Sequence, residues 1–435
     1  MPVTLEEASR GAQTDLDTAV IDEFRKSSAI LDSLIYDEAV NPSGGGAVLT
    51  YGYRRLATQA GAAFRQLNTE YVPGEVITEI HVVTLAPLGG SFQIDRVIAK
   101  IGAPSETGLQ MGQKIKATQA KFNDAIINGD TAVEAYGFDG LDKALSGSST
   151  EIGVGVVTDW SDFDTVSRAE HKAIDKIDEF LSYLDGPPTM LISNKQVLAR
   201  VRAAARRAGQ YTRDPLADLV DNSGRPIYRE TYGGILLVDA GEKAGSNAQV
   251  VGQRTRDLNG ATFTLQVTGT PTGGTFTLSA NVEGAGAVTT DPIAYNASNA
   301  DIDAALEALA NVGAGDVTVT GTTVKTIAFA GSLRYLSVAL TKNAAGLTGG
   351  TSPDVAIAAS GDNTAVSGLS DLYAVRIGLD GFHAVTTAGG SIIQTWLPDF
   401  TSSGAVKTGE VELGPIAVAL KATKAAAVLR NIKTA

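Results

Sequence analysis

Four stretches of the chain carry apolar residues at helical spacing and predict four long helices. They cover residues 5–36, 105–128, 161–184 and 194–209. The second is the best delimited, because Pro104 precedes it and Asn128-Gly129 ends it, as helix start and stop signals require. A glycine-rich stretch at 41–46 predicts a flexible joint behind the first helix.

A long two-stranded projection is predicted after this joint. Strand-like stretches at 47–56 and 75–85 flank a segment of small and polar residues. An isolated two-stranded hairpin is only marginally stable in water, so it needs a surface to lie on. Its apolar residues, which we expect to be exposed, suggest that this surface belongs to another molecule. The expected subunit-contact residues are Tyr51, Tyr53, Arg54, Arg55, Phe64, Arg65 and Tyr71.

The remaining strands divide between a host region and an insert. Host strands are predicted at 91–101, 189–192, 233–238 and 415–429. Between 259 and 365, alternating Thr, Val and Leu residues with glycine-rich turns predict a β-sandwich-like domain with one short helix, capped by Ser298 or Asn299. We expect it to be inserted into a surface loop, where insertions are best tolerated. The fold class is therefore α+β.

Composition narrows the function. The 435 residues suggest two or three folded units, and a net charge of −13 argues against a dedicated nucleic-acid binder. Cysteine is absent and the three histidines (His81, His171, His383) are isolated, so no disulfide or metal site is expected. No nucleotide, zinc or serine-hydrolase motif occurs, and we predict neither an enzyme nor a cofactor. No apolar run approaches the roughly 20 residues of a membrane span, nor is a secretory signal present, so we expect a soluble protein.

Two charged clusters leave alternatives open. Asp159, Asp162 and Asp164 could bind a hard cation, but complementing a helix dipole is the simpler interpretation. The basic cluster either contacts nucleic acid or acidic groups on a neighbouring subunit, or is an ordinary charged helix surface. It consists of Arg200, Arg202, Arg206, Arg207 and Arg213.

The order of elements resembles the major capsid proteins of tailed bacteriophages, the Hong Kong 97-like fold. The stretches that carry this resemblance are YGYRR at 51–55 with FQIDR at 92–96, KFNDAIINGD at 121–130 with FDGL at 138–141, and WLPDF at 396–400 with GAVK at 404–407. The resemblance implies an N-terminal arm at 1–45, an extended loop at 46–88, a peripheral domain at 89–150 with a spine helix at 105–128, an axial domain at 151–258 and 366–403, final peripheral strands at 404–435, and the insert at 259–365.

The resemblance also implies a function. The chain would self-assemble into hexamers and pentamers of an icosahedral shell around double-stranded DNA, with non-specific DNA contact. Further partners would be a portal and separate scaffolding or decoration proteins, with assembly in the bacterial cytoplasm and no membrane. The alternative is an encapsulin-like compartment that encloses cargo protein.

The sequence departs from the type member of that family in two respects. No lysine occurs between Lys26 and Lys100, so the extended loop cannot supply the amine of an intersubunit lysine–asparagine cross-link. No long prodomain precedes the arm, so we expect no N-terminal processing. The insert would project from the capsomer, either as decoration, which we favour because it lacks an aromatic cluster, or as a host-surface adhesion module.

Overall fold

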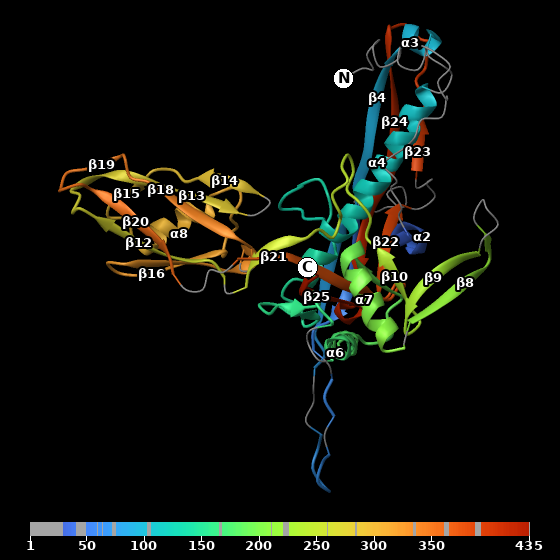
Figure 1. The fold of residues 1–435 in the computed structure, drawn as a ribbon, viewed down its shortest axis with the longest axis horizontal. Coiled ribbons are helices and arrows are strands. Elements are labelled where there is room, and N and C mark those ends of the chain that lie inside the picture. The colour runs from blue at the N-terminus through green and yellow to red at the C-terminus, as the bar shows by residue number, and fades with distance from the viewer. Residues whose placement is uncertain are drawn as a thin grey trace. The chain divides into compact units, whose positions relative to one another are not determined.

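The protein is described by a computed structural model, drawn in Figure 1. The described residues are 29–40, 49–58, 60–62, 64–71, 75–101, 106–164, 168–209, 211–220, 226–258, 260–282, 285–333, 336–360, 365–387 and 393–434. The chain forms two compact units. Unit 1 comprises Met1–Ile152, Glu170–Gly252 and Leu372–Val428; unit 2 comprises Gly153–Ala169, Gln253–Asp371 and Leu429–Ala435.

The N-terminal helix differs from the prediction where it can be compared. Most of the predicted helix, and the whole of the joint at 41–46, lie outside the described residues. Within them, α2 covers only Ala29–Ser33, and Tyr36–Val40 forms the strand β1. β1 pairs in parallel with β22 (Phe382–Thr387), and Ile30 and Leu34 are buried in the main core. Pairing with β22 therefore wins over local helical spacing after Ser33.

A five-stranded sheet forms the central framework of unit 1. The order is β1-β22-β24-β23, and β4 also pairs with β24. The bounds are Ala86–Asp95 for β4, Ile393–Trp396 for β23 and Val406–Leu420 for β24. The helix α4 (Glu106–Asn128), at the expected place, packs along β4 and β24 (Figure 1). Its face buries Phe122, Ile126 and Ile127 in the main core and Met111 in a smaller cluster with Phe92 and Ile94.

The predicted strand 91–101 is wrong in its second half. β4 ends at Asp95, and the helix α3 (Arg96–Ile101) follows directly. The reason is local, because Asp95 Oδ1 accepts a hydrogen bond from Val97 N at 2.7 Å. A carboxylate that accepts a hydrogen bond from a backbone amide two residues later in the chain favours a helix start over a continuing strand.

The second sheet of unit 1 is accompanied by three helices. β7 (Met190–Ser193) pairs in parallel with β10 (Ile235–Asp239) and antiparallel with residues 373–375 of β21 (Ala365–Val375). β9 (Pro226–Tyr232) and β8 (Tyr211–Val220) extend it. The helices are α5 (Leu141–Leu145), α6 (Ala169–Ser182) and α7 (Lys195–Arg207), of which α7 packs against β10 and β8.

Helix α6 starts later than predicted, and the acidic cluster has a different role. Asp159 accepts a hydrogen bond from Ser161 N at 2.8 Å, and Asp162 accepts one from Asp164 N at 2.7 Å. These bonds close turns ahead of the helix, as aspartates commonly do. The proposed helix-dipole role for the cluster is therefore wrong, since none of the three carboxylates lies in the first turn of α6.

Unit 2 has its own core between two sheets. One sheet runs β16-β17-β12-β20, and in the other β13 pairs with β14, β15, β18 and β19. The bounds are Thr262–Thr268 (β12), Gly273–Val282 (β13), Gly286–Thr289 (β14), Ile293–Ala294 (β15), Val317–Gly321 (β16), Lys325–Phe329 (β17), Val338–Asn343 (β18), Leu347–Thr348 (β19) and Asp354–Ala359 (β20). Leu265, Leu278 and Ile327 are fully buried in a shared cluster. Helix α8 (Asn299–Glu307) is capped by Ser298, one of the two predicted caps, in a capping box with Asp301.

Short strands bring segments outside 259–365 into unit 2. β11 (Arg254–Asp257) pairs with β21, and residues 432–433 of β25 (Ala426–Lys433) pair with β6 (Thr158–Asp159). A fully buried carboxylate, Asp371, joins these segments. Arg256 donates to it through two nitrogens at 2.8 and 2.7 Å, and Arg430 donates at 3.1 Å. Burial alone would raise the pKa of Asp371, but the two guanidinium groups hold it well below its ordinary value of 3.8.

Replacing Asp371 by alanine should destabilise the protein by about 3–5 kcal/mol, because it leaves buried guanidinium groups without their counter-charge. Chemical denaturation measures this loss. In the wild type, the depressed pKa means that the contribution of Asp371 is present above pH 3.8 and is lost as the pH falls further. The matched control is Asp354→Ala, which removes an exposed partner of Lys342 and should leave the midpoint nearly unchanged.

Candidate subunit-contact surfaces

The predicted projection is a hairpin of β2 (Thr50–Leu56) and β3 (Thr78–Thr84). The strands are antiparallel, in register from Thr50↔Thr84 to Leu56↔Thr78. Together they form a separate two-stranded sheet, drawn in blue in Figure 1. Too few strands are present to form a core of their own, so neighbouring surfaces decide how stable each part of the hairpin is.

The base of the hairpin is attached to its own chain. Tyr51 Oη donates to Asp37 Oδ2 at 3.1 Å, Tyr53 Oη donates to the Leu420 carbonyl at 2.9 Å, and Arg55 Nε donates to the Lys421 carbonyl at 2.9 Å. The Arg55 guanidinium also lies over the Tyr53 ring. Our expectation that Tyr51 and Tyr53 are exposed is therefore wrong, since both are half-buried against unit 1.

The distal part of the hairpin has no such attachment among the described residues. Phe64 is fully exposed, Leu67 is 91% exposed, and Tyr71 is largely exposed. Arg65 donates to the Thr69 carbonyl at 3.1 Å and its guanidinium lies 5.3 Å from the centre of the Tyr71 ring. Arg54 is exposed on β2. Of the predicted contact residues, Arg54, Phe64, Arg65 and Tyr71 are thus available to another molecule, and large apolar side chains dominate this surface.

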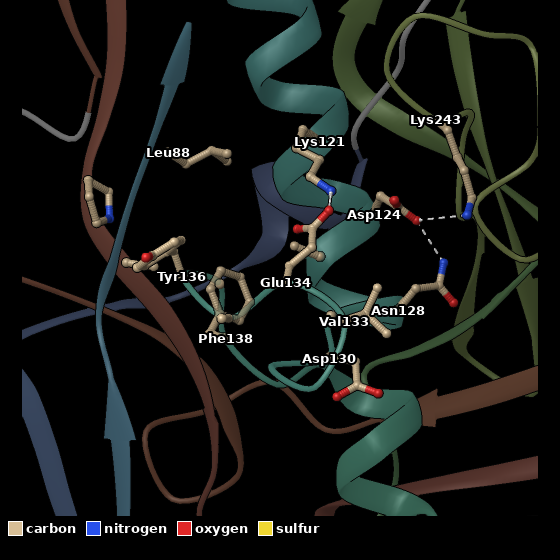
Figure 2. Close-up of a pocket in the computed structure, with 16 residues that line it drawn as sticks. Leu88, Lys121, Asp124, Asn128, Asp130, Val133, Glu134, Tyr136, Phe138 and Lys243 are labelled. Atoms are coloured by element: carbon tan, nitrogen blue, oxygen red, sulfur yellow. Dashed lines mark hydrogen bonds and ion pairs between the residues drawn. The ribbon is translucent and has the colours of Figure 1, made fainter. Parts of the chain in front are cut away.

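A groove on unit 1 offers a second apolar surface. It lies between the start of β4, helix α4 and the loop 129–140, and its volume is about 720 Å³ (Figure 2). Glycines allow the loop to return to the helix: a Cβ at Gly129 would lie 2.4 Å from the Phe138 carbonyl oxygen. Phe138 anchors the loop by packing edge-on against Phe122.

The rim of the groove is apolar and its ions are paired. Val133 is 82% and Tyr136 is 95% exposed, both on the loop. Lys121 binds Glu134, and Lys243 lies 3.7 Å from Asp124 (Figure 2). Because these charges already have partners, the part of the groove that would gain most from being covered is its exposed apolar rim. This surface was not predicted from the sequence, since its only signal there is two large apolar residues in a loop.

The predicted basic cluster is divided by the structure. Arg202 binds Glu230 at 2.7 Å, so its charge is compensated within unit 1. Arg206 and Arg207 are exposed in the last turn of α7, where positive charge also complements the helix dipole. Arg200 is half-exposed on the same helix, and the Arg213 side chain lies outside the described residues. A DNA or subunit contact for this cluster stays a prediction.

Chemistry-bearing groups are sparse over the part of the chain that the structure describes. No group of three or more His, Asp and Glu side chains could hold a metal ion there. Likewise, none of the described helices combines the length and apolar character that crossing a membrane requires. His81 stacks on Tyr53, with ring centres 5.7 Å apart, His171 is exposed, and His383 is buried.

Weakening the base of the hairpin should loosen its strands. Tyr53→Phe removes the hydrogen bond to the Leu420 carbonyl and should cost about 1 kcal/mol of local stability. The amides of β2 and β3 should therefore exchange about fivefold faster. Hydrogen exchange measures this effect. Tyr71→Phe, at the exposed distal part, serves as the control, and an equal effect of both changes would contradict the attachment.

Comparisons with known proteins find similar structures only. No protein-family model matches the chain, and no curated protein matches it. The holo-SrpI encapsulin complex of Synechococcus elongatus PCC 7942 is 11% identical over 100% of this chain and 97% of that chain, with a TM-score of 0.46. The capsid of the native GTA particle is 9% identical over 97% and 96%, with a TM-score of 0.44. The mature capsid of bacteriophage PhiM1 is 8% identical over 96% and 91%, with a TM-score of 0.41.

The first of these similar structures is an encapsulin complex, and the other two are capsids. The similarity extends over nearly the whole chain in each case. Identities near 10% with TM-scores below 0.5 describe a loose likeness, however.

Proposed function

We propose that this chain is the major capsid protein of a tailed bacteriophage, a subunit that assembles with copies of itself into a closed shell. The observation that carries the proposal is the hairpin, whose base is attached to its own chain while its distal part exposes Phe64, Leu67 and Tyr71. Exposed apolar residues on a projecting arm indicate a binding surface for another molecule.

Burial on a partner would supply the stability that the distal hairpin lacks. Burying one large apolar side chain stabilises a complex by about 1.5–3 kcal/mol. The three exposed side chains could therefore contribute several kcal/mol to binding. The base is already held by Tyr53 and Arg55, which reduces the conformational entropy lost when the distal part binds. The hairpin is therefore suited to reach a neighbouring molecule.

We infer that the neighbour is a second copy and that its receiving surface is the groove at the loop 129–140. The groove exposes Val133 and Tyr136, and its ions are paired internally, so an apolar segment can bind without leaving a charge uncompensated. Hairpin and groove are different surfaces, so the contact is head-to-tail. Head-to-tail contacts close into rings when the rotation between successive copies divides a full turn, and such rings are the geometry of hexamers and pentamers.

The remaining partners follow from the same proposal. The exposed Arg206 and Arg207 are the candidates for non-specific contact with double-stranded DNA, while the net charge of −13 keeps that contact weak. Portal and scaffolding proteins would be separate chains. The two-sheet region of unit 2, which has its own core, would decorate the capsomer or stabilise it.

Removing the apolar surface of the distal hairpin should stop assembly without unfolding the subunit. Phe64→Ser with Leu67→Ser is expected to give soluble, folded monomers in place of particles, checked by electron microscopy and sedimentation. The control is Val324→Ser, which alters an exposed apolar residue on unit 2 and should leave particles intact. Normal particles from the hairpin variant would contradict the proposal.

The pairing of hairpin and groove has a sharper test. A groove variant, Val133→Asp with Tyr136→Asp, should also fail to assemble. In a mixture of the two, the groove variant contributes an intact hairpin and the hairpin variant contributes an intact groove. One contact can then form but no second one, so the mixture should stop at dimers in sedimentation. Monomers alone would show that the two surfaces do not bind each other.

The contents of the particles separate the two shell functions. Particles isolated from the producing cell should contain double-stranded DNA if the chain is a capsid protein. Particles that lack nucleic acid and hold a folded protein would favour the encapsulin-like compartment instead.

A further inference from the structure

A buried histidine lies directly beneath the base of the hairpin. His383, on β22, is 0% exposed, and neither of its ring nitrogens has a hydrogen-bond partner of normal geometry among the described residues. A buried polar group without a partner is costly and calls for a physical explanation. The proposed shell contact does not involve this ring.

Ionisable groups from several neighbouring segments of the described chain lie near the ring. Asp37 Oδ2 on β1 lies 3.8 Å from His383 Nε2, and the ring of Tyr51 on β2 meets the histidine edge-on at 6.0 Å between centres. Lys421 directly follows β24 in the chain, and its Nζ lies 4.0 Å from Asp37 Oδ2. Asp380 precedes β22 and also acts on the charge of the ring. Asp37 would attract a proton to the imidazole, whereas the Lys421 ammonium would repel one.

The same groups hold the hairpin in place. Tyr51 Oη donates to the oxygen of Asp37 that faces His383, and the Lys421 ammonium lies 5.4 Å from the centre of the Tyr51 ring. The carbonyls of Leu420 and Lys421 accept the hydrogen bonds from Tyr53 and Arg55. A change of charge on His383 therefore acts on both attachments, through Asp37 and through the segment 420–421.

We propose that His383 is an acid-sensitive switch for the hairpin. A proton taken from solvent puts a positive charge on the buried ring, draws Asp37 away from Tyr51 and repels Lys421. The bonds from Tyr51, Tyr53 and Arg55 to unit 1 then weaken, and β2 and β3 detach from the body. The inference does not depend on shell formation, because every group in it belongs to one chain.

The direction of the effect follows from linkage. Burial and Lys421 lower the pKa of His383 from its ordinary 6.5, while Asp37, the Gly381 backbone and Asp380 oppose this. A group whose pKa is depressed in the attached state stabilises that state above its free pKa. The contribution is lost as the pH falls below 6.5. Attachment of the hairpin is therefore expected to be strong at pH 8 and weak at pH 5.

Hydrogen exchange of the full-length chain tests the switch, with the association state matched at both pH values. Protection factors, corrected for intrinsic exchange, should fall about tenfold for β2 and β3 between pH 8 and pH 5, below the linkage ceiling of about 30-fold. The amides of β7 and β10 should change little. A hairpin whose protection does not change with pH would overturn the proposal.

Each histidine can be tested separately because the chain has only three. His383→Gln, and His383→Phe as a second neutral replacement, should abolish the pH response of the hairpin. His171→Gln and His81→Gln should retain it, His81 being the stricter control because it lies on the hairpin itself. Asp37→Asn should move the midpoint to lower pH, since it removes the attraction for the proton. A full response in His383→Gln would assign the effect to another group.

Discussion

A two-stranded hairpin is only marginally stable by itself in water, and this constraint decides how the hairpin of unit 1 is attached. The protein meets it at one end by using its own chain, with Tyr53 and Arg55 bonded to the carbonyls of residues 420 and 421. At the other end the constraint is unmet, because Phe64 and Leu67 stay in water. An arm that is held at its base and open at its tip gains stability when another surface covers the tip.

The groove at the loop 129–140 has the complementary property. Phe138 fixes the loop to the core, Gly129 lets it turn back closely, and the ions inside are paired. The exposed part of the groove is apolar, and an apolar surface is what an apolar arm needs in order to bind. Many such contacts of modest strength sum to a robust closed assembly when each subunit makes several of them.

Unit 2 shows a different use of burial. Its two sheets enclose a core of aliphatic side chains together with Phe263, Phe276 and Phe329, so most of its large apolar side chains are buried within the unit itself. Asp371, with Arg256 and Arg430, instead fixes how short strands outside the sandwich are joined. A buried ion pair adds little net stability compared with apolar packing, but it penalises every arrangement that separates its members.

Local signals in the sequence determined helix α4, the positions of β2 and β3, and the Ser298 cap of α8, because each depends on residues a few positions apart. Only the tertiary structure decided which tyrosines of the hairpin are free. Tyr53 finds its acceptor 367 positions away at Leu420, and His383 faces Asp37 across a parallel strand pair. Spacing along the chain carries no information about such contacts, since they arise only when distant strands are brought side by side in one sheet.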